Sequence, residues 1–430
     1  MNSHPLPSPP LTPEKWTPTA IFTLVILGLS AGLQLSDQGV QSLSLSAIQN
    51  TFDTGDTALG SLQGVAGFLI GSLLAIPLSR LVDKYSRKRI LLSFIFASAT
   101  LMALSALAPN FSLFFLGRAS AGILEFAMIP LVYSMIPDLA PEQDRVLANL
   151  GFAAIMAIGA SGGYYFGDVI IATGDAIFSF EAEPWRKGLL LLSVAGLPLF
   201  LLALLTQNPA RYPGLVASSP SDSIVQFLRQ RWKTMVLFMG AAGCMVIAVQ
   251  ALNQLIALAM ERRFDADITS IGQAMGIILL IVSAGSIPAA GLLDRLLGRV
   301  LQQASRPGIM ALGAITSIPA AVALNATAYM DQAFIIIGVF IFLTATANAL
   351  VPTLLQDLLP AAIRARSFAI WSFLVSTFSA SGPLLSGGLS DVLFDHDLLL
   401  AITMTTVPAL CLSAFFALQL VRELRENKAL

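Results

Sequence analysis

Long apolar stretches follow one another along this chain of 430 residues, and each covers the roughly 20 residues that a helix needs to cross a bilayer. A polar segment interrupts the series after the sixth stretch. The predicted spans are 18–44, 58–82, 88–108, 111–137, 145–172, 187–206, 234–260, 269–293, 307–327, 331–356, 363–391 and 397–421. The pattern predicts an all-α polytopic membrane protein with 12 transmembrane helices in two bundles of six.

The composition excludes several other classes of protein. Only 11% of the residues are charged and 56% are apolar, whereas a soluble domain is about a quarter charged. The net charge of −1 and the lack of a long basic run argue against nucleic-acid binding. Both cysteines, Cys244 and Cys411, lie inside apolar stretches, so we expect neither a disulfide framework nor a metal site.

The distribution of basic residues predicts the orientation in the membrane. Nineteen of the 24 Lys and Arg residues fall on one side of the predicted helices and four on the other. The positive-inside rule therefore places both termini in the cytoplasm. The predicted parts are a disordered leader (1–17), a first six-helix bundle (18–206), a cytoplasmic linker (207–233), a second six-helix bundle (234–421) and a cytoplasmic tail (422–430).

A short loop sequence occurs twice. Asp-Leu-Ala-Pro begins at Asp138 and is followed by Arg145, and Asp-Leu-Leu-Pro begins at Asp357 and is followed by Arg364, with the same spacing. Each copy follows the fourth helix of its half. The repeat suggests duplication of a six-helix unit, and parallel halves of this kind bind substrate near the middle of the membrane at their interface.

These features resemble the major facilitator superfamily over residues 18–421. The family has a loop signature, Gly-x-x-x-Asp-Arg-x-Gly-Arg-Arg, between its second and third helices. Residues 79–89 read Ser-Arg-Leu-Val-Asp-Lys-Tyr-Ser-Arg-Lys-Arg, which keeps the acidic and basic positions but has serine for both glycines. The resemblance implies a secondary transporter that works by alternating access.

Two further segments, 56–60 and 76–81, resemble the Spinster-type branch of that family. Members typically carry an Asp-Arg pair in helix 1 and a Gly-Glu-Ala segment after an arginine in helix 4. This chain has Asp37-Gln38 in helix 1, and Arg118 followed by Gly122 and Glu125-Phe126 in helix 4. The resemblance implies lipid-like substrates such as lysophospholipids or sphingoid phosphates, although the helix 1 arginine is absent here.

Three ionisable residues, Asp37, Arg118 and Glu125, lie well inside the predicted spans. Charges there are costly and by default face a cavity and serve a function. Arg118 and Glu125 are two helical turns apart and so share a helix face, with Glu125 deeper in the membrane. We expect Asp37 to pair with Arg118, and Glu125 with Asp37 to carry a coupling proton. The alternative is a static ion pair that only holds helices 1 and 4 together. For Arg118 itself two roles remain open: it binds the headgroup of the substrate, or it shifts the pKa of the neighbouring carboxyl groups.

Other polar and aromatic residues inside the spans are weaker candidates for the cavity. Each has a purely structural alternative, namely an interhelical hydrogen bond for an amide and packing for an aromatic ring. The substrate-cavity candidates besides Arg118 and Glu125 are Gln63, Tyr164, Gln250, Asn253, Gln254 and Trp371.

Charged residues after the second and fourth helices of each half are candidates for conformational gating. We expect them to form ion pairs beside helix ends in one orientation only, which is enough to bias a two-state equilibrium. They are Asp83, Arg87, Asp138 and Arg145 in the first half and Asp294, Asp357 and Arg364 in the second. Asp83→Asn is predicted to favour the inward-facing state. The alternative is that these loop charges only follow the positive-inside rule, which explains the arginines but not Asp83.

The sequence thus predicts a transporter, not an enzyme, with a proton gradient as its energy source and no cofactor. We expect an amphiphilic substrate, a monomer and the bacterial cell membrane as its location. A proton-driven multidrug efflux transporter is the second interpretation, and a channel or a non-transporting receptor is an interpretation of a different class. No nucleotide-binding Gly-rich loop follows a strand, which disfavours a primary pump.

Overall fold

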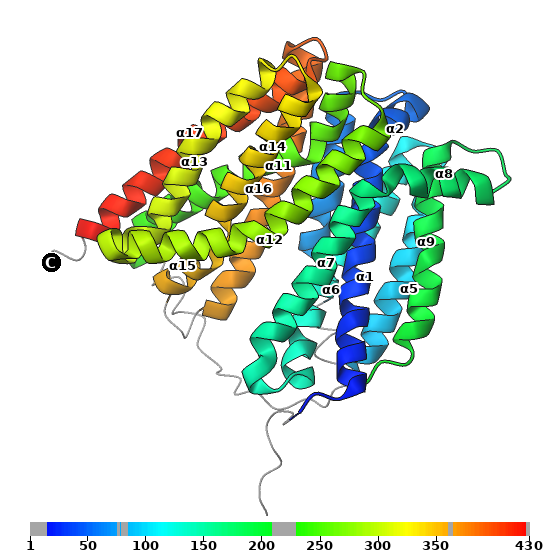
Figure 1. The fold of residues 1–430 in the computed structure, drawn as a ribbon, viewed down its shortest axis with the longest axis horizontal. Coiled ribbons are helices and arrows are strands. Elements are labelled where there is room, and N and C mark those ends of the chain that lie inside the picture. Colours follow the sequence, from blue (N-terminus) through cyan, green and yellow to red (C-terminus); the bar gives the residue numbers. More distant parts are fainter. Residues whose placement is uncertain (1–14, 75–77, 79–84, 209–228, 360–363, 427–430) are drawn as a thin grey trace, which may run out of the picture.

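The computed structural model describes residues 15–74, 78, 85–208, 229–359 and 364–426. Within these ranges the chain is helical and has no strand (Figure 1). The first half contains α1 (Pro18–Leu43), α2 (Leu45–Phe52), α3 (Asp56–Ser61), the π-helix η1 (Leu62–Ile70), α5 (Arg87–Ala106), α6 (Phe111–Leu139), η2 (Glu142–Asp144), α7 (Arg145–Tyr165), α8 (Gly167–Ile177) and α9 (Pro184–Ala203). The second half contains α11 (Trp232–Phe264), α12 (Ile268–Leu301), η3 (Gln302–Ala304), α13 (Ser305–Asn325), α14 (Met330–Asn348), α15 (Val351–Leu358), α16 (Arg364–Leu393) and α17 (Leu398–Glu426).

Eleven helices among the described residues are long and apolar enough to cross a membrane. They correspond to eleven of the predicted spans, and the 30-residue helix α16 covers the remaining one. The prediction of an all-α membrane protein is therefore confirmed. The expected leader and linker fall largely on residues 1–14 and 209–228, which lie outside the described ranges.

Two predicted helices are divided in the structure. The span predicted at 145–172 breaks at Phe166 between α7 and α8, next to Gly167, and glycine has a low helix propensity. The span predicted at 331–356 breaks at Leu350 between α14 and α15. Pro352 lies in the first turn of α15, where its missing N–H group is tolerated, but it disfavours a helix that continues through it.

The second predicted span, 58–82, begins as an α-helix and continues as a π-helix of nine residues, η1. This segment contacts α16 of the second half. At Gly60, a Cβ atom would lie 2.2 Å from the backbone oxygen of Pro383, so only glycine permits this approach. The position of η1 thus depends on a contact between the two halves that helix periodicity does not reveal.

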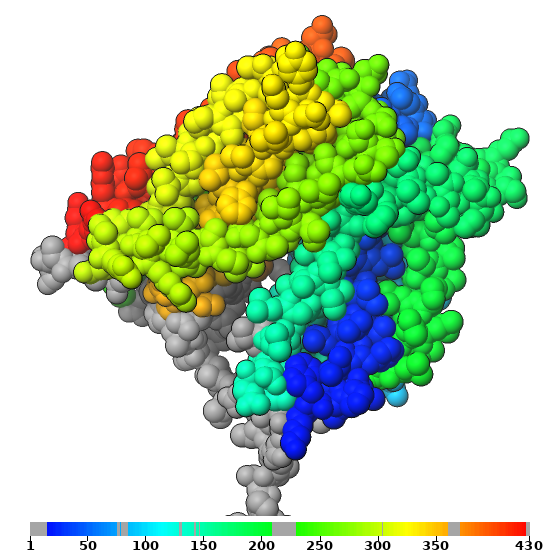
Figure 2. All heavy atoms as spheres, viewed as in Figure 1, coloured from blue at the N-terminus to red at the C-terminus, as the bar shows by residue number. Residues whose placement is uncertain are grey.

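The helices of the two halves converge at one end of the molecule and separate toward the other (Figure 1). We call the converging end distal and the opposite end, where α1 begins and α17 ends, proximal. The most extensive described contacts between the halves are those of α3 and η1 with α16, and of α7 with α12. The space-filling view shows α12 crossing against α7, with the halves apart below that point (Figure 2).

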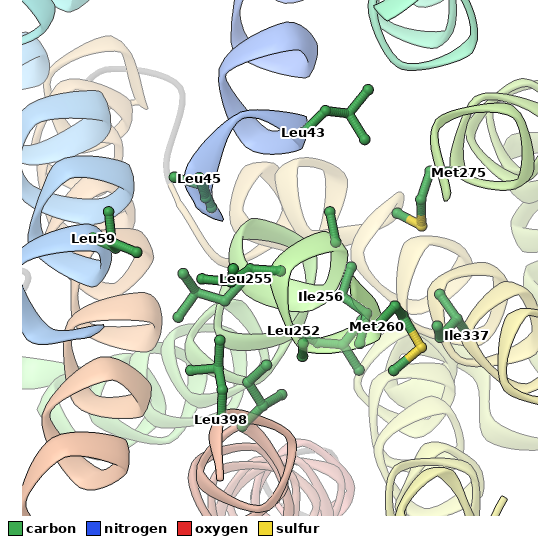
Figure 3. Close-up of a cluster of buried hydrophobic side chains, with 14 of the residues drawn as sticks. Leu43, Leu45, Leu59, Leu252, Leu255, Ile256, Met260, Met275, Ile337 and Leu398 are labelled. Atoms are coloured by element: carbon green, nitrogen blue, oxygen red, sulfur yellow. The ribbon is translucent and has the colours of Figure 1, made fainter. Parts of the chain in front are cut away.

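The largest apolar cluster joins both halves near the distal end. Figure 3 shows Leu43, Leu45 and Leu59 of the first half beside second-half side chains, including Leu255 and Met275. Smaller clusters lie within each half. Burial of apolar side chains therefore holds the distal end closed and leaves the proximal end free of a shared core among the described residues.

Candidate functional site

The predicted pair of Asp37 and Arg118 is present in the structure. Asp37 lies in α1 and Arg118 in α6, and the Arg118 Nη1 atom forms an ion pair with Asp37 Oδ2. The Asp37 side chain is 0% exposed and the Arg118 side chain 6%. The two charges therefore neutralise each other inside the first half, between two helices that pack together.

Glu125 lies on the same helix as Arg118, two turns further along. Asn110 is the N-cap residue of α6, and its side chain accepts a hydrogen bond from the backbone N–H of Leu113. The helix runs unbroken past Glu125. Gln38 of α1 donates a hydrogen bond from Nε2 to Glu125 Oε2 at 2.7 Å. The carboxylate of Glu125 is thus held by a neutral amide, while the arginine nearby is occupied by Asp37.

A chain of amides continues from these charges to the second half. Gln41 Nε2 donates to Gln63 Oε1 at 3.0 Å, and Gln63 Nε2 donates to Ser42 Oγ at 3.0 Å. The Gln63 amide also reaches the backbone oxygen of Gln254 in α11 at 3.4 Å. Gln254 in turn donates to Gln250 Oε1 at 3.1 Å. Three of the predicted cavity residues, Gln63, Gln250 and Gln254, therefore meet at the interface between the halves.

The charges and the amides surround a small cavity of about 20 Å³, which is room for a water-sized group. It lies between α1, η1, α6 and α11. Its lining residues are Gln38, Gln41, Leu62, Gln63, Gly67, Phe68, Arg118, Gly122, Glu125 and Gln254. The π-helix η1 contributes four of them, in keeping with the occurrence of π-helical turns at functional sites.

The remaining candidates, Tyr164, Trp371 and Asn253, are not among the residues that line this cavity. Tyr164 lies where α7 approaches α12, since its backbone oxygen is close to Gly272. Trp371 is buried against Phe238, with ring centroids 5.0 Å apart, in an apolar cluster of the second half. Asn253 has a buried side-chain oxygen without a hydrogen-bond partner among the described residues.

A second set of polar residues, which the sequence reasoning missed, lies at the distal end. We call Gln49, Asp56, Thr57, Arg262, Ser390, Asp391 and His396 the distal cluster. Arg262 of α11 donates to both carboxylate oxygens of the buried Asp56, at 2.6 and 2.8 Å. Ser390 of α16 donates to Asp56 Oδ2 at 2.6 Å. Two second-half helices thus hold one carboxylate of the first half.

Asp391 makes the reverse connection in the distal cluster. Its carboxylate accepts hydrogen bonds from the backbone N–H groups of Asp56 and Thr57 at 2.9 and 2.8 Å, and from Thr57 Oγ1 at 2.7 Å. A side chain of α16 therefore caps the first turn of α3. The Nδ1 atom of His396 lies 3.3 Å from Asp391 Oδ1. These residues sit at the ends of predicted spans, where charges are common, so only their pairing across the halves would have identified them.

Arg87 and Asp138, two gating candidates of the first half, form an ion pair at the proximal end. Arg87, at the start of α5, pairs with Asp138 near the end of α6, at 2.5 Å. Arg145 instead donates a hydrogen bond to the backbone oxygen of Pro137 at 3.4 Å. Asp83 lies outside the described residues. The observed pair joins two helices of the same half.

In the second half, Asp294 and Asp357 share a partner that the sequence reasoning did not name. Arg306, at the start of α13, forms ion pairs with both carboxylates. Arg306 follows Arg87 at the same interval in the sequence at which Asp357 follows Asp138, so the same helix ends are paired in both halves. This repeat interval was the signal that would have identified Arg306. The side chain of Arg364 is not among those described.

Comparisons with known proteins agree with this architecture. The model of the Major Facilitator Superfamily matches residues 27–383. Protein spinster of Drosophila melanogaster is 24% identical over 396 residues, which cover 87% of this chain and 62% of that protein. The transcription regulatory protein OpdE of Pseudomonas aeruginosa is 27% identical over 273 residues, or 60% of this chain and 62% of that protein. The chain thus spans about three fifths of the length of either relative.

Solved structures show the same fold at low sequence identity. A bacterial homologue of the human lysosomal transporter Spinster, in an inward-facing and unoccupied conformation, superposes with a TM-score of 0.81. The two are 19% identical, and the match covers 95% of this chain and 98% of the other. A D-xylose–proton symporter has a TM-score of 0.66 at 17% identity, covering 91% and 97% of the two chains. With the family model matching residues 27–383, this chain belongs to the major facilitator superfamily and is a multi-pass membrane protein.

Proposed function

We propose that this protein is a proton-coupled secondary transporter that moves an amphiphilic, lipid-like molecule by alternating access. One observation carries the proposal. At the interface of the two halves, Glu125 is a carboxylate whose hydrogen-bond partner is the neutral amide of Gln38, beside a charge pair that is already balanced. A carboxyl group in this position takes up and releases a proton without breaking a structural ion pair.

The geometry also supports the alternating-access part of the proposal. Residues 18–206 and 234–421 act as the two rocking bundles, and the positive-inside rule places the proximal end in the cytoplasm. The described contacts between the bundles lie in the middle and at the distal end, and the ion pairs at the proximal end stay within one bundle. Under this proposal, the state described here is the one that is open toward the cytoplasm.

The lipid-like substrate class rests on the similarity to protein spinster and on the apolar cavity wall that Leu62 and Phe68 supply. Proton-driven efflux of hydrophobic drugs is the second candidate, because the same wall and the same carboxylate suit such compounds. A screen for thermal stabilisation by lysolipids, sphingoid phosphates, sugars and cationic drugs separates the two candidates and selects a substrate for transport assays.

The proton role of Glu125 is tested in proteoliposomes with an imposed pH gradient. Glu125→Gln should abolish gradient-driven accumulation of the selected substrate, because the amide cannot carry a proton. Exchange of labelled for unlabelled substrate without a gradient should persist in this variant, which distinguishes a transporter from a channel or a receptor. Glu181→Gln, in an exposed loop, is the matched control. Unchanged pH dependence in Glu125→Gln refutes the proton role.

A further inference from the structure

The central cavity has a net negative charge when Glu125 is ionised. Among the described residues that line it, Arg118 is the cation, and Asp37 neutralises it. The other polar lining side chains are the amides of Gln38, Gln41, Gln63 and Gln254. A single arginine thus faces two carboxylates, Asp37 and Glu125, and the three side chains together carry a net charge of −1 when both carboxylates are ionised.

The hydrogen-bonding capacity of the cavity is also incomplete outside the Asp37–Arg118 ion pair. The Gln41 side chain donates to Gln63, but its own oxygen, Oε1, has no hydrogen-bond partner among the described residues. Gln41 is only 4% exposed and lines the cavity. A buried acceptor that is left unpaired loses its hydration without compensation, so the site favours a ligand that donates a hydrogen bond there.

An aromatic ring completes the surroundings. Phe68 of η1 lines the same cavity, and its edge-to-face contact with Phe126 holds it in place, with ring centroids 6.2 Å apart and planes at 73°. Aromatic faces attract cations. A negative charge, an unpaired hydrogen-bond acceptor and an aromatic ring together favour a ligand group that is positively charged and donates hydrogen bonds.

We propose that the cavity recognises a protonated amine, so that the transported amphiphile carries an ammonium headgroup that pairs with Glu125 and donates to Gln41. This inference rests on the proposed function and narrows its substrate class. An anionic headgroup finds no vacant cation among the described lining residues, because Arg118 is occupied by Asp37. A quaternary ammonium group pairs with the charge of Glu125, but it has no N–H group to donate to the Oε1 atom of Gln41.

In this arrangement, a proton and the protonated amine compete for the carboxylate of Glu125. The groups that face Glu125 are Gln38 and Asp37 from α1 and Arg118 from α6, with Gln63 from η1 and Gln254 from α11 across the cavity. Protonation of Glu125 removes the only uncompensated charge in this set. Acidification should therefore weaken amine binding, while an alkyl amine itself stays protonated, as lysine does.

The test measures equilibrium binding of tritiated dodecylamine to the full chain in nanodiscs by scintillation proximity. Unlabelled dodecylamine should compete fully, dodecyltrimethylammonium more weakly and dodecanoate not at all. Glu125→Gln should weaken binding at least about tenfold, as expected for loss of a charged contact, and should remove its pH dependence. Equal competition by dodecyltrimethylammonium or by dodecanoate overturns the inference, as does unchanged binding in Glu125→Gln.

A pair of variants at Gln38 separates charge from folding. Gln38→Arg adds a fixed cation beside Glu125 and should abolish amine binding. Gln38→Met is neutral and of similar length; it removes the hydrogen bond to Glu125 but adds no charge, and should weaken binding much less. Equal loss in both variants contradicts the charge argument. Amine binding without gradient-driven transport would refute the proposed function alone, and proton-driven transport of another amphiphile without amine binding would refute this inference alone.

Discussion

The distal cluster makes a quantitative prediction for Asp391→Asn. The substitution keeps the size of the side chain but replaces one carboxylate oxygen by an NH₂ group, which cannot accept the hydrogen bonds from Thr57 or Asp56. Because Asp391 lies in α16 and its partners in α3, these bonds form only while the distal ends of the two halves touch. The variant should therefore favour opening of the distal end.

The magnitude follows from the three hydrogen bonds that Asp391 accepts, at 2.7 to 2.9 Å. Loss of a helix N-cap costs about 1 kcal/mol, in a range of roughly 0.5–2 kcal/mol. The Asp391 side chain is 20% exposed, so solvent screens part of its charge, and the middle of that range applies. A change of about 1 kcal/mol alters the ratio of distal-open to distal-closed molecules by about fivefold.

The assay is a distance measurement between spin labels on two exposed distal loops. Cysteines at Glu181 in the first half and Tyr329 in the second carry the labels, in a chain in which Cys244 and Cys411 are replaced by serine. The population at longer distances should grow about fivefold in Asp391→Asn. The control is Asp265→Asn, at an exposed distal position with φ of 48° that asparagine tolerates. An unchanged distribution, or the same change in the control, refutes the reasoning.

Two further predictions concern the first half, and both are read from thermal unfolding in detergent. Arg118→Leu leaves the buried Asp37 without a partner and should lower the free energy of unfolding by about 3 kcal/mol or more. Adding Asp37→Asn to this variant should restore much of the lost stability, and a double variant as unstable as Arg118→Leu contradicts the paired-charge interpretation. Gly163→Ala places a Cβ atom 2.3 Å from Ser36 Cα and should lower the free energy of unfolding by about 1–3 kcal/mol. In the control Gly151→Ala, the new Cβ atom has nothing within 4 Å and should stabilise the helix by up to about 1 kcal/mol; equal effects of the two variants contradict the packing argument.

The helices were predictable because a helix needs about 20 predominantly apolar residues in a row to cross a bilayer, and such a stretch can be recognised from neighbouring residues alone. The π-helix η1 was not predictable, since it accompanies the approach of Gly60 to the backbone of Pro383, which lies in the other half of the chain. The break between α7 and α8 is similar, because a Cβ atom at Gly167, where α8 begins, would lie 2.4 Å from Leu43 Cδ1 of α1, a contact that local propensity does not reveal.

The central charges were predictable for a related reason. Asp37, Arg118 and Glu125 stand out because charged residues are rare deep in apolar spans, and helical spacing placed Arg118 and Glu125 on one helix face. The hydrogen bond from Gln38 to Glu125 was not predictable, since it depends on the rotation of α1 against α6. The distal cluster was missed because Asp56 and Asp391 lie at helix ends, where a charge carries little information.

The internal repeat explains why the chemistry of the two halves differs. The interval from Asp138 to Asp357 maps α6 onto α14 and α15 from end to end, and it maps the Arg87–Asp138 pair onto Arg306–Asp357. The same interval maps Arg118 onto Ile337 and Glu125 onto Thr344, both fully buried in the second half. The duplicated framework thus keeps its proximal ion pairs in both halves, whereas the central charges occur in the first half only. A single site with one free carboxylate follows from this asymmetry, because the second half contributes neutral amides from α11 in place of a second set of charges.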